Sequence, residues 1–136
     1  MNKRVAWDPA FGVGHETIDA QHRAILDRCN ALAEHCRDDG GDDASRQAFQ
    51  QAYSALMALA REHFAAEAAL LAERGYPELE DYRHECAEFD YLAAEIVTTE
   101  NFDPIELQRF LALWWVGHIM GAAQRQGPFL RQSPAA

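Results

Sequence analysis

Four segments of the chain carry apolar residues at alternating spacings of three and four, which is the period of an α-helix. They run from about Thr17 to Arg37, from near Ser45 to Arg74, from about Leu79 to Ile96, and from Pro104 to near Gly127. The connections between them are short, so consecutive helices must be neighbours in space. The pattern therefore predicts an all-α fold, an antiparallel up-down-up-down four-helix bundle with an N-terminal arm.

Turn-forming residues mark several ends of these segments. Gly75 and Pro77 in "RGYP" suit the end of the second segment, and Asp103 in "DPIE" suits the cap of the fourth. We expect one domain over residues 1–136. Within it we expect the arm over about 1–16, the bundle over about 17–127, and a tail without helical pattern over about 128–136.

The charge of the chain argues against two classes of partner. Lys and Arg total 12 against 22 Asp and Glu, so the formal net charge is -10. Such a surface repels nucleic acid and anionic membranes. The sequence has neither an apolar run of about 20 residues nor a signal-peptide core at its start, so we expect a cytoplasmic protein. Three scattered cysteines, Cys29, Cys36 and Cys86, are read as free thiols.

Six polar residues fall on stripes that should face the bundle interior. They are His22, His63, Glu67, Tyr82, Cys86 and His118. In antiparallel order all six positions fall at the same end of the bundle, and burying them unpaired would cost several kcal/mol. Three imidazoles and a carboxylate at one level form a metal-ligand set. The alternative is a set of core polar residues satisfied by backbone carbonyls or buried water.

Four stretches carry a resemblance to a known family. "VGHETIDAQH", "HFAAEAALL", "GYPELEDY" and "LWWVGHI" stand in the order and at about the intervals of the hemerythrin family, after an arm that contains Trp7. The chain thus resembles a bacterial hemerythrin-like bundle, whose usual members hold two carboxylate-bridged non-haem irons and bind O2 reversibly. In this resemblance His22, His63, Glu67 and His118 match family ligands.

The chain departs from the family pattern at three positions. Tyr82 and Cys86 stand where the family has two histidines, and Ala123 stands where it has a bridging aspartate. Each of the two irons of the family has its own set of ligands, here called a half-site. The resemblance therefore implies that one half-site survives as His22, His63 and Glu67, while the other keeps only His118. His84 lies about 200° around the helix from Tyr82, so it cannot replace the lost histidine. We do not expect an ordinary oxygen carrier.

Four interpretations of the site stay open. The one we favour is a single non-haem iron or zinc ion on His22, His63, Glu67 and His118, with a role in oxygen or redox sensing and O2 or another small diatomic as ligand. In the second, Tyr82 and Cys86 act as replacement ligands in a modified two-metal centre. The third is haem, for which no "C-x-x-C-H" motif is present. The fourth is a metal-free sensing or interaction module; no catalytic triad or phosphate loop favours an enzyme.

Overall fold

Four long helices contain most of the residues that the structure, a computed structural model, describes, which are 5–36, 42–98 and 103–131. The helices are α1 (Glu16–Ala33), α2 (Asp43–Glu73), α3 (Leu79–Thr98) and α4 (Pro104–Gly121). Three shorter elements, η1 (Pro9–Phe11), η2 (Ala122–Gln126) and α5 (Gly127–Leu130), flank them, and the described residues contain no strand. The predicted all-α four-helix bundle is confirmed.

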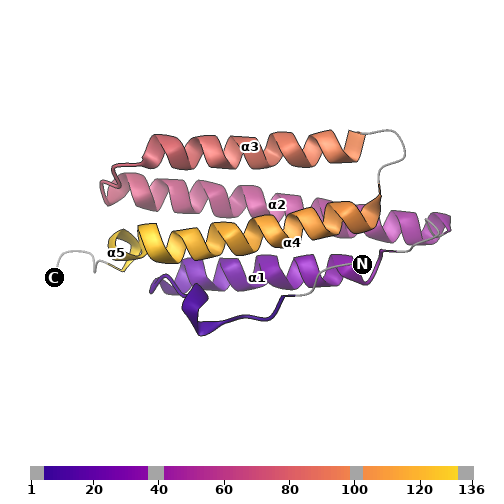
Figure 1. Ribbon diagram of the computed structural model, residues 1–136, viewed down its shortest axis with the longest axis horizontal. Coiled ribbons are helices and arrows are strands. Elements are labelled where there is room, and N and C mark those ends of the chain that lie inside the picture. Colours follow the sequence, from indigo (N-terminus) through magenta and orange to yellow (C-terminus); the bar gives the residue numbers. More distant parts are fainter. Residues whose placement is uncertain (1–4, 37–41, 99–102, 132–136) are drawn as a thin grey trace.

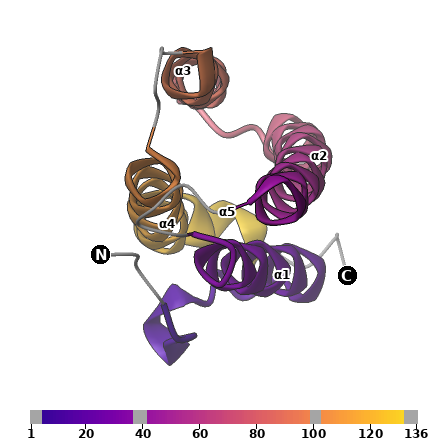
Figure 2. The ribbon, with the colours of Figure 1, turned by 90° about the vertical axis from the view of Figure 1, so that its right-hand side faces the viewer.

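The helices run side by side in alternating directions (Figure 1). Each helix contacts the next one in the chain, and α4 closes the bundle against α1. Seen from the end, α3 lies diagonally opposite α1 (Figure 2). The starts of α1 and α3 and the ends of α2 and α4 therefore meet at one end of the bundle.

Side-chain caps begin three of the long helices. His15 Nδ1 accepts the Ile18 N–H of α1 at 3.3 Å. Asp42 does the same for Ser45 of α2 at 2.8 Å, and Asp103 for Ile105 of α4 at 2.9 Å. Each cap satisfies a backbone N–H that the helix itself leaves without a partner.

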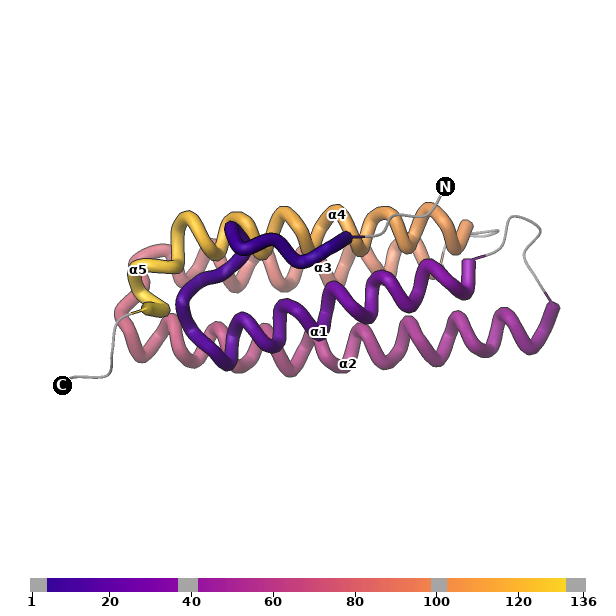
Figure 3. The backbone as a smooth tube through the Cα atoms, turned by 90° about the horizontal axis from the view of Figure 1, so that it is seen from below, coloured from indigo at the N-terminus to yellow at the C-terminus, as the bar shows by residue number. Residues whose placement is uncertain are grey.

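The N-terminal segment is attached to the bundle by its backbone and by one aromatic ring. Val5 N donates to Asn30 Oδ1 at 2.7 Å, and Asn30 Nδ2 donates back to Val5 O at 2.7 Å. The Trp7 ring lies 4.6 Å from the guanidinium carbon of Arg23. The segment consequently runs over α1 and α4 (Figure 3). Residues 1–4 of the expected arm lie outside the described part of the chain.

The first helix is shorter than the sequence pattern predicts. It ends at Ala33 instead of Arg37. The next three residues bond three positions back, with Cys36 N donating to Ala33 O at 3.3 Å. This tighter 3₁₀-type spacing breaks the α-helical ladder. Residues 37–41, which include most of the predicted "DDGGDD" turn, are outside the described residues.

The C-terminal region differs from the expectation of an irregular tail. α4 passes into the π-helical turn η2, and α5 follows where we expected no helix. Pro128 lies in the first turn of α5, where its missing N–H costs nothing, and Leu130 is only 1 % exposed. Burial of Leu130 therefore holds this end against the bundle. Residues 132–136 lie outside the described residues.

Two hydrophobic clusters fill the interior, with a polar layer between them. The larger includes Phe89 and Trp115, and the smaller includes Ile18, Leu71 and Leu130. Along each of α1, α2 and α4 a buried polar residue lies between members of the two clusters. No helix in the described ranges is both long and apolar enough to cross a membrane.

Candidate metal centre

The buried polar layer consists of four residues from three helices. They are His22 of α1, His63 and Glu67 of α2, and His118 of α4. His63 and Glu67 are four residues apart, so they share one face of α2. The exposed fractions are 0 % for the first three and 4 % for His118. The structure thus brings together all four residues that the sequence places at one level.

The donor atoms of the four side chains converge on one point. Glu67 Oε2 lies 2.7 Å from His63 Nε2 and 3.2 Å from His22 Nε2. Glu67 Oε1 lies 3.3 Å from His118 Nε2, and the Nε2 atoms of His22 and His63 are 3.1 Å apart. One donor atom from each residue lies within 4.8 Å of all the others. Every histidine presents Nε2, and Glu67 presents both oxygens.

Several of these atoms lack the partners that buried polar groups need. Glu67 Oε1, Glu67 Oε2 and His118 Nε2 make no hydrogen bond of good geometry with any described residue, although they lie close to one another. An unsatisfied buried polar group costs about 1–3 kcal/mol, and more when it is charged. A cation at the centre of the group would satisfy all three atoms at once, so the donor set fits a metal ion.

Charges within the group keep the carboxylate ionised. Burial alone would raise the pKa of Glu67, but its contacts with the three imidazoles, led by His118, lower that pKa well below its usual range. Burial lowers the pKa of His22 to about 4 despite the nearby carboxylate. Burial also opposes protonation of His118, yet Glu67 and Glu85 raise its pKa to about 9. A metal ion at the centre of the group would therefore compete with protonation of His118.

A family comparison supports cation binding by this chain. A model of the hemerythrin HHE cation-binding domain matches residues 13–130. The chain belongs to the hemerythrin HHE cation-binding family. Comparison of the chain with curated proteins and with solved structures finds no significant match. The protein is a hemerythrin-like domain with a buried His/Glu group that suits a metal cation.

Two residues outside the group orient its imidazoles. Gln21 Oε1 lies 2.8 Å from His63 Nδ1, and Glu85 Oε1 lies 3.3 Å from His118 Nδ1. Such partners fix the rotation of an imidazole, so the other ring nitrogen faces the centre of the group. The sequence analysis missed both residues. Gln21 belongs to the hemerythrin-like "D-x-Q-H" stretch, where it directly precedes His22, so the motif could have indicated a role for it. Its side chain contacts His63 of α2 instead of His22.

Aromatic rings cover the group on the side of the larger core cluster. The ring of Trp114 stacks on His118 with centroids 5.1 Å apart and planes 11° apart. The Trp115 ring meets His118 at 5.0 Å and His63 at 5.7 Å, both edge to face. These rings keep water from that side of the hemerythrin-like centre and lower the local dielectric. Charges within the group therefore act more strongly on one another.

Tyr82 and Cys86 lie beside the group, and the structure does not bring Cys86 into it. Tyr82 is 3 % exposed, and its ring centroid lies 6.0 Å from that of His118. Its hydroxyl has no hydrogen bond of good geometry, and burial raises its pKa. Burial also raises the pKa of the half-buried Cys86 thiol to about 12, so the thiol stays protonated at neutral pH.

Ala123, the third departure from the hemerythrin pattern, and the other histidines contribute no donor atom to the group. Ala123 is half-buried in η2 and packs against the smaller cluster. His84 is exposed on α3, as its angle around the helix predicts. His15 caps α1, and His35 is half-buried beyond the end of that helix. These histidines take no part in the group.

Proposed function

We propose that this hemerythrin-like domain holds a single non-haem iron ion on His22, His63, Glu67 and His118, with zinc as the alternative occupant. The observation that carries the proposal is the buried convergence of four donor atoms within 4.8 Å of one another. Three imidazoles and one carboxylate suit both metals. Membership of the cation-binding family supports iron as the first choice.

The residues around a bound ion would determine its ligand geometry and its access to small molecules. A bound iron would supply a redox-active centre with an open position for O2 or another small diatomic molecule. Gln21 and Glu85 hold the imidazoles of His63 and His118 with Nε2 inward, and the indoles restrict water. We propose that the domain senses oxygen or redox state on this centre. We assign it no catalytic reaction.

The other interpretations of the site have weaker support. A two-metal centre would need donors from Tyr82 and Cys86, but burial disfavours the charged form of each. We do not propose haem, because the cavity beside His118 is about 160 Å³, well below the 300–1,000 Å³ of sites for drug-sized ligands. A metal-free module would leave the Glu67 carboxylate fully buried with only imidazole nitrogens as its partners, at hydrogen-bond geometry that is poor.

The cysteines and the sequence motifs bear on where the protein works. All three cysteines are free, as thiols of cytoplasmic proteins usually are. We propose a bacterial cytoplasmic protein on this basis and on the resemblance of its motifs to bacterial members of the family.

Elemental analysis of protein purified without a metal-affinity tag tests the proposal. We expect about one iron or zinc ion per chain, because one set of donors is present. The variants His63→Ala and His22→Ala should each lose the ion, whereas His84→Ala, which changes an exposed histidine, should keep it. A ratio near two would overturn the single-ion proposal, and unchanged metal in both donor variants would overturn the site.

A further inference from the structure

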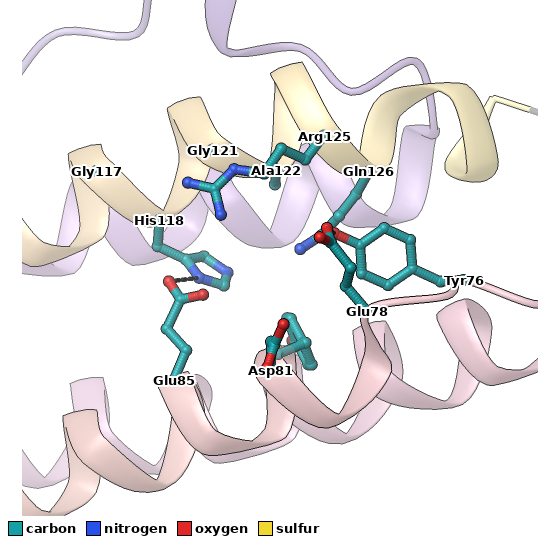
Figure 4. Close-up of a pocket in the computed structure, with 11 residues that line it drawn as sticks. Tyr76, Glu78, Asp81, Glu85, Gly117, His118, Gly121, Ala122, Arg125 and Gln126 are labelled. Atoms are coloured by element: carbon teal, nitrogen blue, oxygen red, sulfur yellow. Dashed lines mark hydrogen bonds and ion pairs between the residues drawn. The ribbon is translucent and has the colours of Figure 1, made fainter.

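A small cavity opens beside the metal centre, between α3 on one side and α4 with η2 on the other (Figure 4). Its volume is about 160 Å³. A cavity needs about 10–15 Å³ of such volume to hold one water, so this cavity has room for several waters or a small molecule. His118 forms part of its wall, so the cavity and the metal centre share a residue.

Two opposite charges face this cavity from opposite walls. Arg125 extends from η2 and Asp81 from α3 (Figure 4). Neither side chain makes an ion pair within 4.0 Å with any residue in the described ranges. The other two carboxylates of the lining are engaged: Glu85 contacts His118 Nδ1 at 3.3 Å, and Glu78 accepts the Tyr76 hydroxyl at 3.2 Å. Arg125 and Asp81 therefore face the same space without forming an ion pair, in a lining that also contains the carboxylates of Glu78 and Glu85.

One buried polar group also lines the cavity without a partner. Gln126 Oε1 has no hydrogen bond with described residues, and Gln126 is 5 % exposed. Buried groups of this kind are nearly always hydrogen-bonded in folded proteins. A ligand that donates a hydrogen bond would satisfy this oxygen. The Tyr82 hydroxyl, which also belongs to the lining, lies beside the Glu67 carboxylate and the Cys86 thiol.

Glycines keep one wall of the cavity open. Gly117 and Gly121 are one turn apart on α4 and both face the cavity. A Cβ atom added to Gly117 would meet nothing within 4 Å, and one added to Gly121 would first meet the Arg125 guanidinium at 3.6 Å. Larger residues at these positions would fill the cavity. The two glycines therefore add no side chain to this wall, and the Arg125 guanidinium itself lies against Gly121.

We propose that this cavity binds a small zwitterion of the size of a simple α-amino acid. Its carboxylate would pair with Arg125, whose guanidinium offers parallel N–H donors, and its ammonium would pair with Asp81. Gln126 Oε1 would accept a hydrogen bond from the ammonium. Glycine, with five non-hydrogen atoms, is the smallest ligand of this class.

The position of the cavity would bring such a ligand into contact with a residue of the metal centre. A bound zwitterion would contact His118, the histidine whose other nitrogen faces Glu67. The binding of the zwitterion does not depend on the metal proposal, because the residues that hold its charges, Arg125 and Asp81, are not metal donors.

Isothermal titration of the full chain, as purified, with glycine and L-alanine tests this site. Ethylamine and propionate, which carry one charge each, serve as comparison ligands. We expect the amino acids to bind at least about tenfold more tightly than either, because each charge-assisted hydrogen bond contributes a factor of this size. Equal binding of ethylamine would indicate a plain cation site, and equal binding of propionate a plain anion site; either result, or no binding of any amino acid, would overturn the proposal.

Variants at the two charges make the test specific. Arg125→Gln and Asp81→Asn change exposed side chains, so the fold should survive, and each should weaken glycine binding by about tenfold or more. Arg109→Gln and Asp27→Asn change exposed side chains elsewhere and should leave binding unchanged. Metal content should stay the same in all four variants, which separates this site from the metal centre. Unchanged glycine binding in both Arg125→Gln and Asp81→Asn would also overturn the proposed zwitterion site.

Discussion

His63 Nε2 lies 2.7 Å from Glu67 Oε2, one helical turn away on α2, and both side chains are fully buried. This contact fixes the relative position of two donors of the centre, because α2 holds them at a constant spacing. His22 and His118 approach the same carboxylate from the neighbouring helices. The carboxylate of Glu67 therefore lies within 3.3 Å of a ring nitrogen of each of the three histidines.

Replacing Glu67 with glutamine should remove the metal ion without unfolding the bundle. Glutamine keeps the size of the side chain but removes the charge that attracts a cation to a buried site. We expect metal content to fall to about a tenth or less, while helical circular dichroism is unchanged. Glu62→Gln, an exposed position on the same helix, is the matched control and should keep its metal. Full metal content in Glu67→Gln would contradict the role of the carboxylate.

The contact between Gln21 and His63 gives a second prediction. Removal of a group that orients a metal-binding imidazole typically lowers metal affinity by about 10–100-fold. Gln21→Leu should show such a loss in competition with a chelator of known affinity. Gln21→Glu should restore affinity, because its carboxylate also accepts the Nδ1–H of His63. Equal affinity in Gln21→Leu and the parent would show that ring rotation is fixed by packing alone.

The sequence alone predicts the bundle and its family. The apolar period is sustained over four segments, and residues such as Asp103 and Gly75 mark helix ends by local chemistry. The C-terminal end was not predictable, because Pro128 ends most helical patterns and here opens α5. Whether a proline ends one helix or begins the next depends on burial of Leu130, which is a tertiary property.

The candidate site likewise has a part that the sequence predicts and a part that depends on tertiary structure. The four donors could be placed at one level, since helix faces and heights follow from spacing along the chain. The orienting residues Gln21 and Glu85 could not be found in this way, because the rotation of an imidazole depends on side chains from other helices. The cavity beside His118 was equally hidden, since its charges come from separate segments.

Metal supply should stabilise the native protein. An ion that binds only the folded state at about 100 times its Kd contributes about 2.7 kcal/mol, which raises Tm by about 10 °C for a chain of this size. Thermal unfolding followed by circular dichroism, with added iron or zinc and with a chelator, measures this difference. His63→Ala should show no such shift. An identical Tm under all conditions for the parent protein would favour a metal-free module.

Cys86→Ser should leave the metal centre unchanged. Cys86 is not among the four residues whose donor atoms converge, and burial raises the pKa of its thiol from the usual value near 9 to about 12. A thiol must lose its proton to bind a metal. We therefore expect equal metal content and equal absorption spectra in Cys86→Ser and the parent. Loss of a sulfur-to-metal absorption band in the variant would instead establish Cys86 as a ligand.

Restoring the missing donors should convert the centre to one that binds two ions. Tyr82 and Cys86 are one turn apart on α3, and Tyr82 packs beside His118, so histidines at both positions would stand next to a donor that is already present. In the triple variant Tyr82→His, Cys86→His, Ala123→Asp, bound iron should rise from about one to about two per chain. Tyr82→Phe with Cys86→Ala, which removes the polar atoms without adding donors, is the control and should keep about one. A triple variant that stays helical and still binds a single ion would show that the second half-site requires more than its lost donors.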